Sequence, residues 1–194
     1  MKKISVIVCA LFLGSSVFAQ DVKFGLKAGL NVSTLSNSQG GERGSRLGLN
    51  AGALGHIHLS PQWAIQPEVV FSSQGAKYTV LNEEHSLALN YINIPLQLQY
   101  MFDNGFRLEA GPQVGFLLRA KQKVGSSAAR DIKDNFKSTD IGLAAGISYV
   151  APSTGFGVDL RYNLGLTNIN NVSSVKQTNR GGQIGVFYLF HHRH

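Results

Sequence analysis

Cysteine and charge are both scarce in this chain of 194 residues. Its one cysteine, Cys9, lies near the N-terminus, so no disulfide within the chain can hold the fold together. Only 15% of residues are charged, whereas 22 are glycine. Soluble domains carry about a quarter charged residues. The composition therefore disfavours an ordinary water-soluble surface.

Long apolar runs are also missing, except for one at the N-terminus. This run extends from Ile4 to Phe18, follows Lys2 and Lys3, and leads to a small residue, Ala19. A membrane-spanning helix needs about 20 apolar residues, and the run is shorter. The pattern is typical of a secretory signal peptide. We therefore predict a signal peptide over residues 1–19, cleaved after Ala19, and an exported chain.

Acidic residues are outnumbered by basic ones. Beyond the predicted signal peptide, sixteen Lys and Arg face eleven Asp and Glu, a net charge of +5. No basic stretch is interleaved with aromatic residues, as a stacking platform for nucleic acid requires. The charge instead favours an anionic lipopolysaccharide surface as the neighbour, and no nucleic acid partner is predicted.

Apolar and polar residues alternate along most of the exported chain. In the segment FGVDLRYNLGL, Phe156, Val158 and Leu160 lie on one parity, and Asp159 and Arg161 lie on the other. Side chains of a strand point to opposite faces in turn, so each such segment predicts a two-faced β-strand. There are eight segments: 22–35, 46–59, 63–76, 87–102, 106–120, 139–150, 156–166 and 181–190.

The connections between these segments alternate in length. Residues 60–62, 103–105 and 151–155 contain Pro, Asn or Gly, as tight turns require. Residues 36–45, 77–86, 121–138 and 170–180 are longer and polar. Short turns on one rim and long loops on the other are typical of outer-membrane barrels, with both chain ends periplasmic. The sequence predicts an all-β fold, a single eight-stranded antiparallel transmembrane β-barrel over residues 20–190, with a His-rich tail at 191–194.

Two barrel types fit eight two-faced strands. A soluble barrel of the lipocalin type would turn the apolar face inward and expose a face rich in Lys and Glu. Here the second face is mostly Gly, Asn, Gln and Ser, which favours a narrow polar lumen with lipid outside. Aromatic residues of the apolar parity gather near the short turns, as in an interfacial girdle. They are Trp63, Tyr100, Phe102, Phe106, Tyr149, Phe156, Tyr188 and Phe190.

The charged residues of the polar face have to lie in this lumen. They are Lys23, Lys27, Glu68, Arg107, Glu109, Asp159 and Arg161. An eight-stranded barrel leaves an interior only wide enough for side chains to fill, and burying an unpaired ion costs several kcal/mol. We therefore predict a network of ion pairs that plugs the barrel, with glycines leaving room for the long side chains.

Several short motifs occur in a characteristic order along the exported chain. They are Ile94-Pro95-Leu96, Glu109-Ala110-Gly111-Pro112, Asp140-Ile141-Gly142-Leu143, Asp159-Leu160-Arg161-Tyr162, Gly165-Leu166 and the aromatic end at Phe190. With the signal peptide, they resemble the PorT-like family of outer-membrane β-barrel proteins. The resemblance implies a small barrel of the OmpX and OmpA type in the outer membrane of a Gram-negative bacterium. It also implies a link to protein secretion.

Residues with catalytic or metal-binding chemistry are few. His56 and His58 share one strand face, but no third metal ligand follows from the spacing. His85 lies beside Glu83 and Glu84 in a polar stretch, and no Gly-x-Ser-x-Gly nucleophile motif occurs. The sequence predicts no catalytic residue, no metal site, no cofactor and no enzymatic activity.

The longest predicted loop, residues 121–138, has a net charge of +3. Its basic residues are Lys121, Lys123, Arg130, Lys133 and Lys137, and they form the predicted extracellular contact loop. Predicted partners are outer-membrane lipid and lipopolysaccharide, the barrel-assembly machinery during insertion, and a protein at the extracellular loops. Two functions remain open: a structural or partner-binding barrel, and an accessory subunit of a secretion or envelope-assembly machine.

Overall fold

The computed structural model describes residues 22–37, 44–80, 83–172 and 176–190; the predicted signal peptide and His-rich tail lie outside these ranges. Its strands are β1 Val22–Asn37, β2 Gly44–His58, β3 Trp63–Val80, β4 Glu83–Met101, β5 Phe106–Val124, β6 Arg130–Asp131, β7 Thr139–Val150, β8 Phe156–Gly165 and β9 Gln177–Leu189. The described residues form one short 3-10 helix, η2 Lys133–Asn135, and contain no helix long and apolar enough to cross a membrane.

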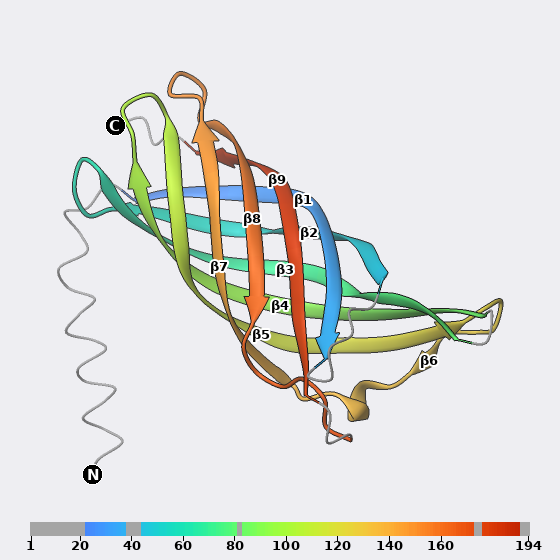
Figure 1. Cartoon of the computed structure of the whole chain (residues 1–194). Coiled ribbons are helices and arrows are strands. Elements are labelled where there is room, and N and C mark those ends of the chain that lie inside the picture. The colour runs from blue at the N-terminus through green and yellow to red at the C-terminus, as the bar shows by residue number, and fades with distance from the viewer. Residues whose placement is uncertain (1–21, 38–43, 81–82, 173–175, 191–194) are drawn as a thin grey trace, which may run out of the picture.

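Eight antiparallel strands close into a ring in the order β1-β2-β3-β4-β5-β7-β8-β9 (Figure 1). Strand β9 pairs with β1, and β4 pairs with β5, so each long strand has two neighbours. The two-residue strand β6 adds only to the outer end of β5. Closure satisfies backbone groups that an open sheet edge would leave unpaired. The prediction of a single eight-stranded antiparallel barrel is confirmed.

The two faces of the barrel wall differ as the alternation predicts. Outward-facing apolar residues are largely exposed, for example Leu26 at 57% and Leu49 at 64%. Inward-facing polar residues are buried, including Gln97 at 0% and Glu68 at 2%. Soluble proteins do not expose an apolar band on every strand. The alternative of a soluble barrel with an apolar interior is therefore wrong.

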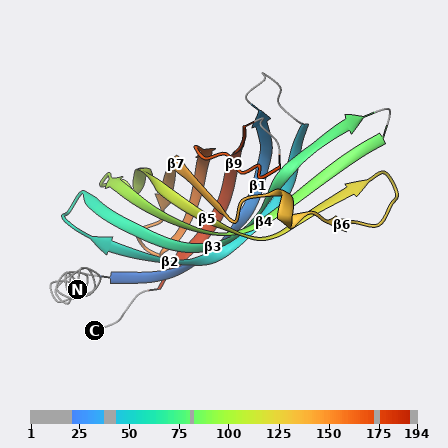
Figure 2. The ribbon, with the colours of Figure 1, turned by 90° about the horizontal axis from the view of Figure 1, so that it is seen from below.

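The two ends of the barrel are unlike. Three tight turns and the ends of β1 and β9 lie at what we call the short-turn end (Figure 1). Gly105 and Gly155 adopt φ values of 91° and 76° in two of these turns, a conformation that favours glycine. At the opposite, long-loop end, β3, β4 and β5 extend past the other strands (Figure 2). We call residues 73–80, 83–90 and 119–124 the tongue.

The tongue corrects the prediction of a polar loop at 77–86. β3 and β4 stay paired from Lys77↔Ser86 to Val80↔Glu83. The Lys77 ammonium lies 2.7 Å from the Glu84 carboxylate, and the Tyr78 and His85 rings stack with centroids 5.0 Å apart. Cross-strand pairs of this kind stabilise a two-stranded ladder. The polar composition of residues 77–86 was therefore not sufficient evidence for a loop.

A β-bulge changes the outer half of β5. Tyr91 of β4 pairs with Leu117, but the next residue of β4, Asn90, pairs with Arg119, so Leu118 is extra. Leu118 and Arg119 are consecutive and both exposed, while Ala120 is fully buried. Unbroken alternation would place Arg119 in the lumen. The bulge turns it outward, together with Lys121 and Lys123.

Candidate functional site

The middle of the lumen contains a compact network of buried charges. Arg161 of β8 donates two parallel hydrogen bonds to Glu68 of β3, at 2.9 and 2.6 Å, and its Nε bonds the Glu109 carboxylate of β5. The Lys27 ammonium of β1 lies 3.3 Å from Glu68 and 3.4 Å from Asp159. All five residues are at most 4% exposed. The structure thus brings together five of the seven predicted lumen charges, from four strands.

Neutral amides and the remaining predicted charges surround this network. Gln66 donates to Glu68 at 2.7 Å, and Gln99 donates to Glu109 at 2.8 Å. Arg107 lies on the same strand face as Glu109, nearer the short-turn end, and its Nη1 is 3.5 Å from His56 Nδ1. Lys23 is half-buried near the start of β1. Charge-assisted and bidentate hydrogen bonds of this kind fix both position and orientation.

Apolar clusters lie in the lumen on both sides of the charges, and the parity argument did not predict them. At the short-turn end the cluster contains Leu54, Val150, Phe187 and Leu189, which are at most 6% exposed. At the long-loop end it contains Leu35, Ala76, Leu87, Leu89, Tyr91, Leu117, Ala120 and Ile169. We call them the short-turn cluster and the long-loop cluster. Breaks in the alternation, such as Phe187-Tyr188-Leu189-Phe190, Leu87-Ala88-Leu89 and Leu117-Leu118, are sequence signals for them.

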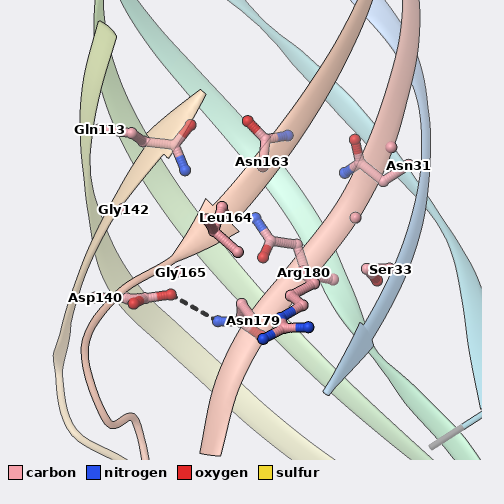
Figure 3. Close-up of a pocket in the computed structure, with 13 residues that line it drawn as sticks. Asn31, Ser33, Gln113, Asp140, Gly142, Asn163, Leu164, Gly165, Asn179 and Arg180 are labelled. Atoms are coloured by element: carbon pink, nitrogen blue, oxygen red, sulfur yellow. Dashed lines mark hydrogen bonds between the residues drawn. The ribbon is translucent and has the colours of Figure 1, made fainter. Parts of the chain in front are cut away.

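A chamber lined by amides together with Asp140 and Arg180 lies in the lumen (Figure 3). Side chains of Gln113, Asn163, Asn31 and Asp140 line the same space from four strands. The Asp140 carboxylate accepts hydrogen bonds from Asn179 at 2.7 Å and from the Thr167 hydroxyl at 2.8 Å. These partners are neutral, so the chamber differs from the ion-paired middle of the lumen.

Two loop segments cover the long-loop cluster. They are residues 132–137, which include η2, and residues 167–171, and we call them the lid. Backbone hydrogen bonds join them, from Lys137 to Ile169 at 2.8 Å and from Asn171 to Asn135 at 2.9 Å. Ile169 is fully buried in the cluster, and Phe136 packs against it. The loop thus folds back over the barrel mouth.

This geometry divides the predicted contact loop into two surfaces. Lys121 and Lys123 belong to β5 and point outward from the tongue, so their assignment to a loop is corrected. Arg130 lies in β6, while Lys133 and Lys137 lie on the lid, and all are exposed. The difference arises because β5 stays paired with β4 as far as Val124, and the bulge turns the side chains of Lys121 and Lys123 outward.

The structure places the predicted aromatic girdle in one band at the short-turn end. Ring centroids are 5.1 Å apart for Trp63–Tyr100, 5.1 Å for Phe106–Tyr149 and 4.8 Å for Phe156–Tyr188. Tyr100 and Tyr188 also contact Phe102 and Phe190, at 5.0 and 5.5 Å. Phe24, 57% exposed at the same end, was not in the predicted set. Amphipathic rings at one level suit a membrane interface.

Histidines of the described chain lie in structural contacts. His56 is fully buried, touching Arg107 and forming an edge-to-face pair with His58 at 4.6 Å. His85 stacks on Tyr78 and contacts Gln122. Within the described ranges, no three His, Cys, Asp or Glu residues are grouped to hold a metal ion.

Known proteins that resemble this chain are outer-membrane barrels as well. A family model described as outer membrane protein beta-barrel domain matches residues 18–171. No curated protein matches the chain. Among solved structures, Ail of Yersinia pestis is 15% identical with a TM-score of 0.53, covering 87% of this chain and 98% of its own. Neisserial surface protein A is 18% identical with a TM-score of 0.50, covering 86% and 97%.

These two likenesses show the fold, and the family match covers most of the chain. The outward apolar band, the buried polar lumen and the closed ring agree with that match. The chain belongs to the outer membrane protein beta-barrel domain family, and its place is the outer membrane of a Gram-negative bacterium.

Proposed function

We propose that this protein acts without catalysis, as a plugged outer-membrane barrel that contacts other molecules at its long-loop end. The proposal is supported chiefly by the filling of the lumen. Ion-paired side chains occupy its middle, and an apolar cluster lies on each side of them. Eight-stranded barrels have interiors narrow enough for side chains to fill. A solute therefore has no continuous path.

The contact surface of this proposal faces the cell exterior. Short periplasmic turns and longer outer loops are the usual arrangement in bacterial barrels. The exposed cations Arg130, Lys133 and Lys137 then lie at the outer mouth. Pairing of β6 with β5 holds Arg130, and the lid's backbone hydrogen bonds hold Lys133 and Lys137. A held basic surface suits an acidic patch on a partner protein, because little ordering is needed on binding.

Absence of catalysis is part of the proposal. A nucleophilic mechanism needs a nucleophile, a base and an orienting group within hydrogen-bond reach. The described histidines instead contact Arg107, His58, Tyr78 and Gln122.

A second candidate function is that of an accessory subunit of a secretion or envelope-assembly machine of the PorT type. The tongue favours it, since three hydrogen-bonded strands that extend past the barrel form a rigid platform for another protein. Crosslinking in the membrane from a photoreactive residue at position 78 or 124, followed by mass spectrometry, decides between the candidates. Specific machine subunits favour the accessory role, and their absence with lipid adducts alone excludes it.

Conductance in planar bilayers tests the plugged lumen. We expect no steady ion current through the wild-type barrel at ±100 mV. The matched variant carries Phe187→Ala and Ile169→Ala, which thin both apolar clusters while keeping every charge. Brief openings of this variant, with a silent wild type, support the proposal. A steady ohmic current through the folded wild type would sink it.

A further inference from the structure

Three cations form a row on the outward face of β5 in the tongue. Arg119, Lys121 and Lys123 are all exposed and alternate with the inward residues Ala120 and Gln122. The bulge at Leu118 produces this arrangement. Within the part of the chain that the structure describes, none of the three forms an ion pair. No ion pair within the described residues therefore neutralises the row.

The row begins where the lipid-facing part of β5 ends. From the aromatic Phe106 outward, Leu108, Phe116 and Leu118 are 45–50% exposed on the apolar face. A tilted strand crosses the hydrocarbon core in about 9–11 residues. Starting from Phe106, that length ends near Phe116. Arg119 to Lys123 therefore lie at the level of the lipid headgroups.

The neighbouring strand leaves space beside the row. Asn90, Ala88 and Ser86 of β4 pair with Arg119, Lys121 and Lys123 in turn, and all three are neutral and short. Two acids lie near the row. Asp131 of β6 pairs with Lys121, and its carboxylate also accepts the Lys133 backbone N–H at 3.0 Å. Glu84 forms its ion pair with Lys77 and also interacts electrostatically with Lys123, so the three cations of the row outnumber the acids beside them.

We propose that Arg119, Lys121 and Lys123 bind the phosphate groups of anionic glycolipid in the outer leaflet. The three Cα atoms span about 13 Å along an extended strand, so the row can reach more than one phosphate of a headgroup. Arginine binds phosphate bidentately, and lysine binds it as a point charge. The proposal rests on the orientation in the proposed function and is independent of the plugged lumen.

Two triple variants with the same loss of charge test the proposal. One carries Arg119→Gln, Lys121→Gln and Lys123→Gln; the control carries Arg130→Gln, Lys133→Gln and Lys137→Gln. The folded full-length chain in detergent micelles is titrated with diphosphorylated lipid A. We expect binding to weaken roughly 10- to 100-fold in the first variant and less than 2-fold in the control. Equal losses in both variants would overturn the proposal.

The same titration distinguishes the sources of phosphate. Enzymatically dephosphorylated lipid A should bind the wild type at least 10-fold more weakly, and inorganic phosphate at the lipid's concentration should not compete. Equal binding of the dephosphorylated lipid, or competition by inorganic phosphate, would contradict a headgroup site. Heat-dependent gel mobility checks that each variant is folded. If the triple variant does not fold, the single variant Lys123→Gln replaces it, because Lys123 lies near the end of the strand. This variant should bind about 3- to 5-fold more weakly than the wild type, and an unchanged affinity would also contradict the proposal.

Orientation is checked separately in intact cells. A Lys123→Cys variant places the sole cysteine beyond the predicted signal peptide on this row. A membrane-impermeant maleimide should label it without opening the outer membrane. Labelling only after opening would show that the proposed orientation is wrong, even where lipid A binds in micelles.

Discussion

The middle of the lumen and its two ends are both filled by side chains, but the middle is filled by charged groups and the ends by apolar groups. In the middle, Arg161 and Lys27 reach across to carboxylates on β3, β5 and β8. At the ends, Phe187 and Ile169 fill the cross-section with apolar groups. Apolar clusters lie on both sides of the ion pairs, and an environment with less water strengthens each charge interaction. We therefore expect the strength of the central ion pairs to depend on the apolar ends.

Glycines leave room beside the charges in the middle of the lumen. A Cβ at Gly185 would lie 2.9 Å from the Asp159 carboxylate, and one at Gly146 would lie 2.3 Å from the Leu160 carbonyl oxygen and 2.8 Å from the Arg161 side chain. Glycine weakens a strand by itself, so its use here reflects crowding by the neighbouring backbone and by the charged side chains.

Removing the central cation should have the largest effect. Arg161→Leu leaves Glu68 and Glu109 buried with fewer partners, and breaking a buried pair in this way costs roughly 3–5 kcal/mol. Urea unfolding of the barrel in lipid vesicles measures the loss. Arg161→Lys, which keeps the charge without the bidentate geometry, is the control and should lose less. An unchanged midpoint for Arg161→Leu would mean that the lumen is hydrated.

The short-turn cluster should rank next. Phe187 is 4% exposed, and truncating a buried phenylalanine usually costs 3–5 kcal/mol. We expect about 3 kcal/mol for Phe187→Ala, at the lower end, because the cavity lies near the mouth at the short-turn end. The same unfolding measurement applies, with the exposed Val186→Ala as the control on the neighbouring position. A loss as small as that of the control would show that the cluster does not seal the lumen.

Truncation in the lid should cost less again. Ile169 is fully buried, but it lies in a loop that can move to fill the gap. We therefore expect about 2 kcal/mol for Ile169→Ala, the low end for a buried aliphatic residue. Proteolysis of folded protein should also cut residues 132–137 faster in this variant, since the lid loses its anchor. Unchanged cleavage, with Val172→Ala as the exposed control, would contradict this role of Ile169.

Alternation predicted the wall of the barrel well and its outer end poorly. The strand limits Phe106, Phe156 and Thr139–Val150 agree with the structure because lipid outside and polar lumen inside impose a strict period of two. That constraint ends beyond the membrane, where both faces meet water or the lid. The pairing of β3 with β4 around the stacked rings of Tyr78 and His85, and the position of the bulge at Leu118, therefore depend on cross-strand contacts. The sequence of a single strand does not specify such contacts.

Parity also predicted which charges face inward but not which of them pair. Lys27 lies beside Glu68 and Asp159 only because the order and stagger of four strands bring them together. The apolar clusters were missed for a related reason. Phe187 and Leu189 sit on the lumen parity of a strand whose other parity is apolar as well, so the segment shows no polar face.

The smallest expected effect tests how tightly the short-turn cluster is packed. A Cβ at Gly157 would lie 2.3 Å from Cζ of the Phe187 ring, closer than any real contact, so the ring has to shift. We expect Gly157→Ala to destabilise the barrel by about 1 kcal/mol, at the low end for overpacking, because a ring near the mouth can move. In the Phe187→Ala background the added methyl meets open space, and its cost should fall to about zero.

Urea unfolding of the four proteins of this double-mutant cycle gives the coupling free energy between the two positions. Gly182→Ala is the control, because its Cβ meets no atom closer than 4.0 Å. Equal costs of Gly157→Ala with and without the ring would show that the strain comes from the β8 backbone, and that Phe187 does not pack over Gly157.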